Sequence, residues 1–473
     1  MQIVFLNPPS LTKDERPVER VFGCTYSLYP IPNIFVLIQA AIARDLGFKV
    51  KYVDGAAMNW HERDLNNFLK KDKSSFIFIH SVNLSLRTDL KTLKIIRSMR
   101  KNVVTIFTGP APTQFPQKFL TDQKTIVVRG EAEKIIQNLL LSYPDLEKVK
   151  GLSYLVNGQI RHNKPEQLIN NLNSLPFPAR DLVDNKLYYN PKINQFPWTV
   201  MLTSRGCFGQ CIFCVPCSAN FATELEYRKH HPNKPIVRFR SAKNIIKEFK
   251  LLSNLGFKSV SIVDDQFIQS EQHIKEISEG IKKLNINWGC LARTDRLGEK
   301  IVSYLKQAGC VYVDLGVESF DQKALNYLRK GIVASDIKNK VALLKKYGIA
   351  PKINILIGAV PWETEDTIMK TLHEVLKMKP ASVMFSLACP FPGTRFYDLA
   401  KKNKWLKTYY PVDVQKKSLL NYKNLTSRQM ENLIQKLNSR FFFSPKFLWQ
   451  NLSLLKSPKK VWQALKSLKK KLS

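Results

Sequence analysis

Three cysteines at a fixed spacing constrain this chain more than any other feature. Cys207, Cys211 and Cys214 follow the pattern CxxxCxxC in one short stretch. Three thiolates at this spacing can ligate three irons of a four-iron, four-sulfur cluster, which leaves the fourth iron open to a ligand that is not protein. Gly206 and Gly209 let the backbone wrap closely around such a core. The spacing therefore predicts a redox-active iron–sulfur cluster with these cysteines as its metal ligands.

Zinc is the alternative metal, because Cys217 forms a CxxC pair with Cys214. Zinc sites usually use two separated ligand pairs. The chain has no distant CxxC or HxxxH, and His230 and His231 are the nearest further ligands. Ligand number and spacing favour iron–sulfur, and Cys217 is expected to be an ordinary thiol. A non-catalytic zinc-binding module stays as the alternative. The remaining cysteines are dispersed and are expected to be core residues or inert thiols: Cys24, Cys290, Cys310 and Cys389.

The cysteine stretch resembles the signature CxxxCxΦC of the radical S-adenosylmethionine (SAM) superfamily, with Phe213 at the aromatic position. Further segments fit the same superfamily in order: 264–267 (DDQF), 293–295 (RTD), 316–319 (GVES), 357–364 (IGAVPWET) and 390–394 (PFPGT). With the N-terminal third, they resemble the cobalamin-binding branch, which includes hopanoid and bacteriochlorophyll methylases and the anaerobic magnesium-protoporphyrin ester cyclase. The resemblance implies that SAM chelates the open iron and is cleaved reductively to methionine and a deoxyadenosyl radical.

The first 145 residues alternate short apolar runs with helical patterns, such as those at 33–46 and 86–100. This alternation predicts an α/β fold, with a doubly wound parallel sheet and helices on both faces. Ligands on such sheets bind beyond the carboxyl ends of the strands. Gly109 and Gly130 lie at these ends, where glycine lets a flat, bulky ligand approach the backbone. Five buried strands are predicted: 3–6, 50–53, 76–79, 103–107 and 126–128.

The two loops that carry these glycines resemble loops of the cobalamin-binding branch. Residues 108–113 (TGPAPT) resemble its GGPHPT-type loop, with Ala111 at the histidine position, and 129–133 (RGEAE) resemble its GEGE-type loop. The resemblance implies a Rossmann-like domain over 1–145 that binds cobalamin through Gly109 and Gly130. The cobalt-ligating DxHxxG segment of other cobalamin proteins is absent, and His80 is expected to be hydrogen-bonded rather than to face the corrin. The alternative is a domain that has lost the cofactor and serves only for packing and recruitment.

Residues 146–196 are predicted to connect two domains, because the proline-punctuated stretch 174–181 cannot form a helix. Strand and helix alternate again over 197–395. Six such units predict an open, partial (β/α)6 barrel with its site at the carboxyl ends of the strands. The predicted strands are 199–202, 259–263, 287–292, 311–315, 353–357 and 383–387. The predicted helices are 241–255, 271–283, 298–308, 335–347 and 364–378.

Residues capable of chemistry recur at the ends of the predicted barrel strands. The cysteine loop follows the first strand, and the later strand ends carry Asp265, Arg293, Glu318 and Gly358 in turn. The resemblance implies that these four residues bind SAM together with Phe213.

Each of these residues has its own expected role. Arg293 can pair the two oxygens of the SAM carboxylate, or form a salt bridge with a neighbour such as Asp295. Glu318 can accept hydrogen bonds from the SAM amino group or the ribose hydroxyls, and Gly358 admits backbone contact with adenine. Asp265 is preferred over its neighbour Asp264, because only one of two consecutive residues should face inward.

The C-terminal region over 396–473 is strongly basic. Residues 401–473 hold 18 Lys and Arg against 2 Asp and Glu, within a chain of net charge +36. Two tandem stretches, 444–456 and 457–469, each begin with Ser-Pro and place Trp among apolar residues. This pattern predicts basic amphipathic helices that contact an anionic membrane surface, or helices packed on the barrel with a solvated lysine face. The apolar face is too continuous for a purely electrostatic nucleic-acid arm, so no nucleic acid is expected.

The start of the chain lacks a charged n-region and a cleavage site, and no apolar run reaches the ~20 residues that span a bilayer. Unpaired thiols suit a reducing compartment. We therefore expect a cytoplasmic protein, peripheral on the inner membrane surface if the tail binds there.

The predicted function is cobalamin-dependent methyl transfer to an unactivated carbon of a hydrophobic, lipid-like or tetrapyrrole substrate. A reducing electron donor such as flavodoxin or ferredoxin is the expected partner. Two other enzymatic alternatives are kept: a radical SAM cyclase or oxidase without methyl transfer, and an RNA-modifying radical SAM enzyme.

Overall fold

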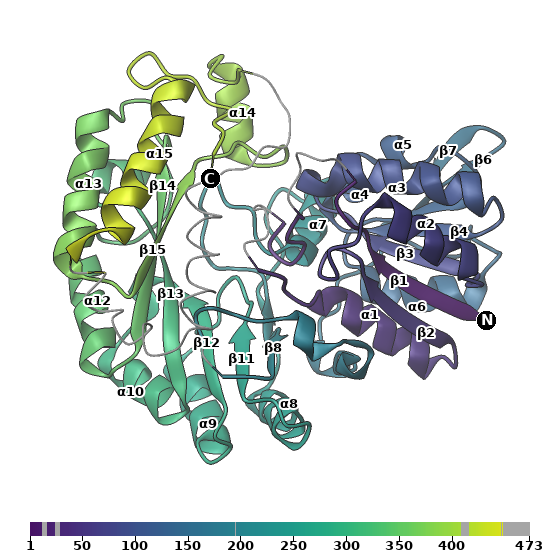
Figure 1. Cartoon of the computed structure of the whole chain (residues 1–473), viewed down its shortest axis with the longest axis horizontal. Helices are drawn as coiled ribbons and strands as arrows, with labels where there is room; N and C mark the ends of the chain where they lie inside the picture. Colours follow the sequence, from purple (N-terminus) through teal and green to yellow (C-terminus); the bar gives the residue numbers. More distant parts are fainter. Residues whose placement is uncertain (12–16, 24–28, 194, 408–415, 446, 448–473) are drawn as a thin grey trace. The chain divides into compact units, whose positions relative to one another are not determined.

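The computed structural model describes residues 1–11, 17–23, 29–193, 195–407, 416–445 and 447. The chain divides into two compact units (Figure 1), described separately below. The first unit comprises 1–189, 199–206 and 215–241, and the second comprises 190–198, 207–214 and 242–473. The predicted domain limits at 1–145, 146–196, 197–395 and 396–473 stay predictions, since compactness alone does not mark a functional domain.

The first unit is built on a seven-stranded sheet of order β2-β1-β3-β4-β5-β6-β7. Strands β1 to β5 are parallel and coincide with the five predicted strands. Its strands are β1 (Gln2–Asn7), β2 (Lys49–Asp54), β3 (Phe76–His80), β4 (Val104–Thr108), β5 (Thr125–Val128), β6 (Leu152–Val156) and β7 (Gln159–His162). Its helices are α1 (Ile34–Asp45), α2 (Glu62–Lys71), α3 (Leu86–Met99), α4 (Pro110–Gln114), α5 (Pro116–Phe119), α6 (Ala132–Ser142) and α7 (Ser218–Tyr227).

The last two strands of this sheet lie within the predicted connector over 146–196, for which no strands were predicted. Strand β6 pairs with β5 in antiparallel fashion, and β7 folds back on β6. The turn between them is Asn157-Gly158, and both residues have positive φ. An Asn-Gly pair between two strands is a strong hairpin signal, so this extension was readable from the sequence. The later part of the connector forms only short 3-10 turns: η2 (Leu172–Ser174), η3 (Arg180–Leu182) and η4 (Asn185–Leu187).

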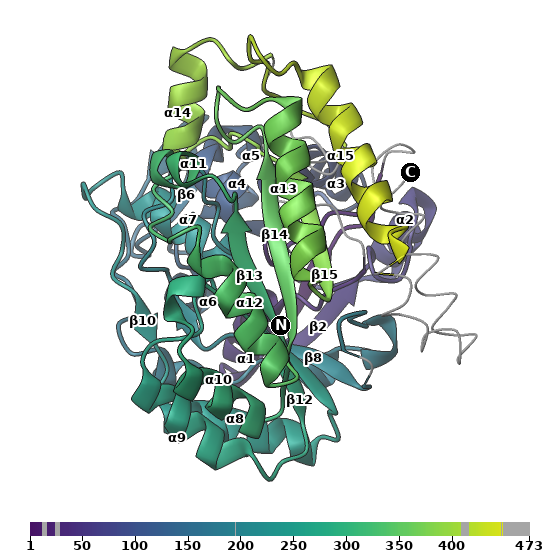
Figure 2. The same ribbon diagram turned by 90° about the vertical axis from the view of Figure 1, so that its left-hand side faces the viewer.

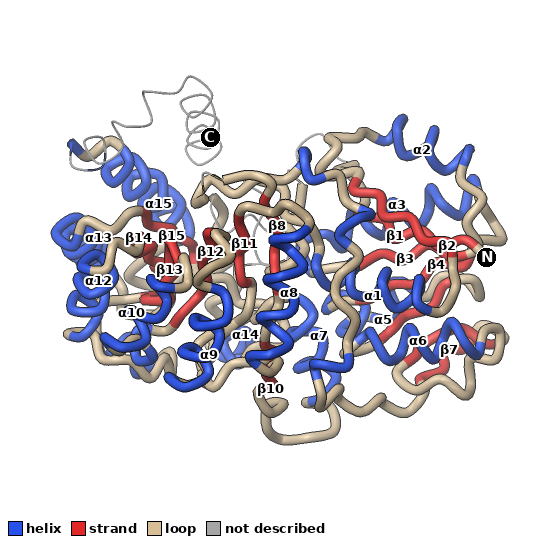
Figure 3. The backbone as a smooth tube through the Cα atoms, turned by 90° about the horizontal axis from the view of Figure 1, so that it is seen from below, coloured by secondary structure: helices blue, strands red, loops and turns tan. Residues whose placement is uncertain are grey.

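Apolar side chains cover both faces of the first sheet. One core packs α1 and α6 against residues such as Phe5, Phe76 and Ile126. The other packs α2, α3 and α5 against alternate residues of the same strands, such as Val4 and Ile77. Figure 3 shows helices on both sides of these strands. The doubly wound arrangement predicted for this part of the chain is therefore confirmed.

A six-stranded sheet has the order β15-β14-β13-β12-β11-β8, and its strands β11 to β15 belong to the second unit. The neighbouring pairs from β11 to β15 are parallel. The strands are β8 (Trp198–Met201), β11 (Ser259–Ile262), β12 (Asn287–Ala292), β13 (Cys310–Glu318), β14 (Ala350–Ile357) and β15 (Ser382–Leu387). The helices are α8 (Ala242–Asn254), α9 (Glu271–Ile281), α10 (Glu299–Gln307), α11 (Gln322–Tyr327), α12 (Asp336–Lys346), α13 (Glu365–Met378), α14 (Arg395–Lys402) and α15 (Ser427–Phe442), with the 3-10 turn η5 (Thr294–Arg296).

Strands β14 and β15 bury every second residue against helices, as in Ile353, Ile355 and Ile357 of β14. Helices α12, α13 and α15 lie along this outer face (Figure 2). The alternate residues on the other face stay partly accessible, which leaves an open inner face at which the strand ends can present side chains. Each predicted barrel helix begins and ends within two residues of a helix in the structure.

Polar caps explain where several of these helices begin. Asn33, Ser270, Thr364 and Thr426 each accept a hydrogen bond from a backbone N–H in the first turn of the following helix. Such caps satisfy donors that the helix itself leaves unpaired.

Within the described part of the chain, no helix is long and apolar enough to cross a membrane. The tandem repeats of the tail fall almost wholly outside the described residues. Membrane contact through this tail therefore stays a prediction.

Candidate functional site

The cysteine loop follows the short strand β9 (Ser204–Arg205) and has no regular secondary structure of its own. The Gly209 N–H donates to the Cys207 thiol at 3.3 Å. A Cβ placed on Gly209 would lie 3.5 and 3.6 Å from the sulfurs of Cys207 and Cys211. The Cys214 N–H donates to the Cys211 carbonyl at 3.4 Å. The sulfurs of Cys207 and Cys211 thus both lie close to Gly209, and all three cysteines are half-buried.

Two backbone hydrogen bonds hold the middle of this loop. The Ile212 N–H donates to the Leu328 carbonyl, and the Ile212 carbonyl accepts from the Phe396 N–H, both at 3.0 Å. Ile212 is buried, whereas Phe213 beside it is only half-buried. The loop is therefore fixed before any ligand is bound, and the aromatic ring of Phe213 stays partly accessible next to Cys214.

Arg293 lies against the cysteine loop. Its Nη1 would be 3.0 Å from a Cβ on Gly209. Its Nε donates to Asp295 at 2.9 Å, and its Nη2 donates to the Lys330 carbonyl at 2.7 Å. Burial lowers the pKa of Arg293, but Asp295 and the charges of Cys211 and Cys207 raise it by a larger amount. The net shift of the pKa is therefore upward. The salt bridge weighed as the alternative role is formed, while the partner role toward a SAM carboxylate stays a prediction.

Glu318 is buried at the end of β13 and pairs with Lys330. The Lys330 Nζ donates to Glu318 Oε1 at 2.8 Å, and both side chains are less than a tenth exposed. Glu318 has a φ of +66°, a backbone conformation that side chains rarely adopt. Burial lowers the pKa of Lys330, and Glu318 and Cys211 more than compensate, so the ammonium is retained. Lys330 is a site residue that the sequence reasoning missed, because its partner is twelve residues away.

The two aspartates after β11 differ in exposure. Asp264 is fully buried, whereas Asp265 is half-buried. Burial raises the pKa of the Cys207 thiol, and the negative charge of Asp265 raises it further. Asp265 is thus the aspartate near the cysteine loop. Its role toward SAM stays a prediction.

The backbone of Gly358 is bonded within the protein. Its N–H donates to Glu363 at 2.6 Å, and its carbonyl accepts from the Tyr422 hydroxyl at 3.0 Å. A Cβ at this position would lie 2.3 Å from the Met430 sulfur. A side chain here would displace Met430 of α15, and the φ of +73° favours glycine, whatever its predicted contact with adenine.

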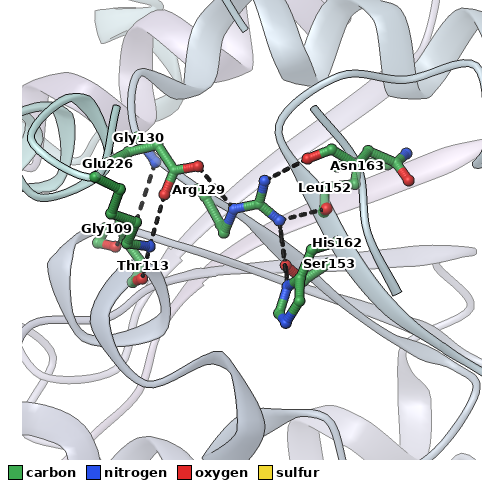
Figure 4. Close-up of polar contacts among 10 residues, drawn as sticks. Gly109, Thr113, Arg129, Gly130, Leu152, Ser153, His162, Asn163 and Glu226 are labelled. Atoms are coloured by element: carbon green, nitrogen blue, oxygen red, sulfur yellow. Dashed lines mark hydrogen bonds and ion pairs between the residues drawn. The ribbon is translucent and has the colours of Figure 1, made fainter. Parts of the chain in front are cut away.

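In the first unit, Gly109 and Gly130 lie on adjacent loops joined through Thr113 (Figure 4). The Thr113 hydroxyl donates to the Gly109 carbonyl at 2.8 Å and accepts from the Gly130 N–H at 3.1 Å. A Cβ on Gly109 would lie 2.5 Å from the Ser81 carbonyl oxygen, and one on Gly130 would lie 3.1 Å from Glu226. Close packing of the protein on itself explains both glycines, and their predicted contact with cobalamin stays a prediction.

Arg129 anchors the second of these loops, as Figure 4 shows. Its Nε donates to Glu226 at 2.9 Å, and its two terminal nitrogens donate to the carbonyls of Leu152 and Asn163 at 2.7 and 2.6 Å. The hairpin β6–β7 thereby supports the loop that carries Gly130.

His80 uses both ring nitrogens for hydrogen bonds. Nδ1 is 3.0 Å from the Thr108 hydroxyl, and Nε2 is 2.8 Å from the Ser218 hydroxyl. Burial lowers the pKa of His80 to about 3, and the Arg20 charge acts in the same direction. The ring is therefore neutral with neither nitrogen available to a metal, as expected for a hydrogen-bonded histidine.

The thiols suit an iron–sulfur cluster better than one metal ion. Among the described residues, no group of three Cys, His, Asp or Glu side chains is arranged to hold a single ion. Ligands to three different irons need not converge on one atom, whereas zinc ligands must. The loop therefore fits the cluster, with Arg293 and Lys330 nearby for an anionic ligand on the open iron.

The carboxyl edge of the first sheet fits a polar cofactor. Within the described residues, three buried side-chain oxygens at the ends of β1 and β3 lack a hydrogen-bond partner: Asn7 Oδ1, Ser81 Oγ and Asn83 Oδ1. The crevice between these two strands is where doubly wound sheets bind ligands. The amide-bearing rim of a cobalamin could satisfy such groups.

Comparison with known proteins identifies the domain that carries the cysteine loop. Residues 201–375 match the model of the Radical SAM superfamily. Residues 201–375 are therefore a radical SAM domain. The resemblance to this superfamily, predicted from the cysteine spacing, is confirmed, and the prediction that the chain is an enzyme is confirmed with it.

Curated relatives align with most of the chain. An uncharacterized methyltransferase of Pyrococcus horikoshii is 29% identical over 96% of this chain and 95% of the relative. The anaerobic magnesium-protoporphyrin IX monomethyl ester cyclase of Rubrivivax gelatinosus is 23% identical over 84% of this chain and 71% of the cyclase. The hopanoid C-3 methylase of Methylococcus capsulatus is 26% identical over 65% of this chain and 57% of the methylase. The predicted branch of the superfamily is therefore the one this chain resembles.

Solved structures show the same fold. The radical SAM methyltransferase TsrM of Kitasatospora setae superposes with a TM-score of 0.65 over 86% of this chain and 77% of TsrM, at 18% identity. The cobalamin-dependent radical SAM enzyme OxsB superposes with a TM-score of 0.61 over 93% of this chain and 61% of OxsB, at 17% identity. The predicted α/β fold class is confirmed.

Proposed function

We propose that this chain is a cobalamin-dependent radical SAM methyltransferase that acts on an unactivated carbon. The observation that carries the proposal is the cysteine loop, whose thiols lie beside Arg293 and the buried Lys330–Glu318 pair at neighbouring strand ends. TsrM and OxsB, whose fold this chain shares, have been seen with cobalamin bound. Together, the cluster, SAM and cobalamin supply one-electron cleavage of SAM to a deoxyadenosyl radical and a carrier for a methyl group.

The protein's own residues bind and orient the cluster, SAM and cobalamin. Cys207, Cys211 and Cys214 hold the cluster, and the cations of Arg293 and Lys330 receive the carboxylate of SAM. Glu318 keeps Lys330 charged in a buried place and can accept hydrogen bonds from SAM. The loops of Gly109 and Gly130 line the carboxyl edge of the first sheet, where cobalamin binds.

The proposed substrate is hydrophobic, either lipid-like or a tetrapyrrole. Support comes from the similarity to a hopanoid C-3 methylase and to a bacteriochlorophyllide d C-12(1)-methyltransferase. The proposed electron donor is a flavodoxin or ferredoxin, because the cluster must be reduced before SAM is cleaved.

One experiment separates methyl transfer from its main alternative. Reduced enzyme is incubated with methyl-labelled SAM and an extract of cellular lipids and pigments. The proposal expects label in an extractable product that depends on the enzyme and the reductant. Deoxyadenosine formation with an altered but unlabelled product would instead favour a cyclase or oxidase. A cyclase is the activity named for relatives aligned over up to 85% of this chain.

A further inference from the structure

The cysteine loop begins from a two-stranded ribbon with a charged base. Strand β9 pairs in antiparallel fashion with β10 (Arg238–Phe239), and Arg205 lies opposite Arg238. The chain between these residues, 206–237, contains all three cluster cysteines. Two like charges opposite each other on paired strands destabilise the pairing unless other groups neutralise them.

Two glutamates that follow Gly130 supply that neutralisation: Glu131 at the N-cap of α6 and Glu133 in its first turn. Glu133 binds both terminal nitrogens of Arg205, at 2.6 and 3.1 Å. Glu131 pairs with Arg205 through one oxygen and with Arg238 through the other, the latter at 2.8 Å. All four side chains are at most 5% exposed.

Glu131 also fixes the connector. Its carboxylate accepts from the Ile169 N–H at 2.7 Å, while Arg238 donates to the Ile169 carbonyl at 2.8 Å. The four side chains Arg205, Arg238, Glu131 and Glu133, called the arginine–glutamate clamp below, therefore join three separate segments of the first unit.

A buried ion cluster of this kind is a weak source of stability, because desolvation offsets the attraction between its charges. Its geometry, in contrast, is demanding, since the forked guanidinium must meet two carboxylates at once. Such a cluster specifies one arrangement of the backbone. Here the cluster of charges fixes the backbone of Arg205, which lies two positions before Cys207, the first metal ligand.

We infer that Glu131 and Glu133 are positioning residues, which hold the point where the chain enters the cysteine loop and so set the placement of the iron–sulfur cluster. Only Gly206, with a φ of +89°, separates Arg205 from Cys207. Two residues span at most ~7 Å, so a shift of Arg205 moves the ligand with it. A misplacement of about 1 Å near reacting groups can cost on the order of 100-fold in rate.

The inference rests on the proposed function for its consequence, but the clamp can be tested separately. The main variant is Arg205→Lys, which keeps the charge and loses the fork. Glu133→Gln is the second variant, which removes one carboxylate. The matched control is Asp89→Asn, which breaks the Arg20–Asp89 pair of the same unit, where both side chains are equally buried. The side chain of Asp89 bonds to Arg20 and Ser85, which lie in neither the Gly130 loop nor the ribbon.

Three readouts are compared in anaerobically reconstituted full-length protein: iron content, the electron paramagnetic resonance spectrum of the reduced cluster with SAM, and product per deoxyadenosine formed. Both clamp variants are expected to bind iron. With SAM present, their spectrum should differ from that of the wild-type protein, and product formation should fall on the order of 100-fold. Asp89→Asn is expected to lower thermal stability while leaving the spectrum and the product ratio unchanged.

Equal spectra in all three variants, with activity falling only in step with thermal stability, would overturn the inference. Should wild-type protein form no methylated product, the proposed function fails. The spectral comparison still decides the positioning role in that case, because it needs only the cluster and SAM.

Discussion

Substitution of Cys211 and of Cys217 distinguishes an iron–sulfur cluster from a zinc site most directly. Cys211 is half-buried beside Gly209 in the cysteine loop, whereas Cys217 is 1% exposed and lies at the start of α7. Cys211→Ala is expected to abolish iron binding and SAM cleavage, and Cys217→Ala to keep both. Iron and zinc analysis of reconstituted protein measures this. Loss of metal in both variants would favour a four-cysteine zinc site.

The surroundings of Gly109 leave no room for a methyl group in place of its hydrogen. Gly109→Ala places a Cβ 2.5 Å from the Ser81 carbonyl at a φ of +99°, and such strain costs about 1–3 kcal/mol or more. Gly47→Ala is the matched control, with a φ of +86° and no atom within 4 Å of the added carbon. Denaturant titration should show a clearly larger loss of unfolding free energy for Gly109→Ala. Equal losses would mean that the Ser81 contact is not restrictive.

The buried His80 should make stability depend on pH. Its pKa is about 3 when folded and near 6.5 when unfolded, so the unfolded chain binds the extra proton between these values. Its contribution is complete above pH 6.5 and is lost as the pH falls toward 3, by up to about 1.4 kcal/mol per pH unit.

Unfolding titrations across this range, compared with His80→Gln, test the expectation. The variant should have a flatter profile, while His230→Gln, at an exposed position, should keep the wild-type slope. An unchanged slope in His80→Gln would show that other groups control the acid limb.

At residue level, the sequence predicted neighbouring site residues only where their spacing is local. The cysteine ligands lie within eight residues and were predicted. Lys330 was not, because its link to Glu318 runs through the turn after α11. Gly358 contacts Tyr422 and Met430, which lie more than sixty residues away in the sequence. No local sequence pattern predicts these contacts.

Helix α15 is the element that closes the outer face beside β15. Met430 is fully buried and meets Gly358, so this helix fixes the loop at the end of β14. Met430→Ala should cost about 2–5 kcal/mol of unfolding free energy through the cavity that it leaves. Arg428→Ala, at an exposed position of the same helix, should cost little. Similar denaturation curves for the two variants would contradict this packing role.

Most strands and helices followed from apolar periodicity and caps, because their buried faces repeat at the spacing of the element. The hairpin β6–β7 was missed because its strands are short and β7 is mostly exposed. Its Asn-Gly turn was the available signal. Pairing of β6 with β5 is a tertiary choice that no single segment encodes.

At the scale of the whole molecule, repeated alternation of strand and helix predicted two α/β parts, and the structure has a sheet in each unit. The sequence did not predict that 199–206 and 215–241 pack with the first unit. The reason is the arginine–glutamate clamp, since Arg205 and Arg238 find their carboxylates on the Gly130 loop.

Anaerobic reconstitution followed by reduction in the presence of SAM tests whether the three thiols hold a cluster that cleaves SAM. The account predicts that the purified chain takes up about four irons, as a four-iron, four-sulfur cluster requires. It also predicts that a strong reductant then releases deoxyadenosine and methionine. A chain that holds zinc without iron, or one that builds the cluster but never cleaves SAM, would contradict it.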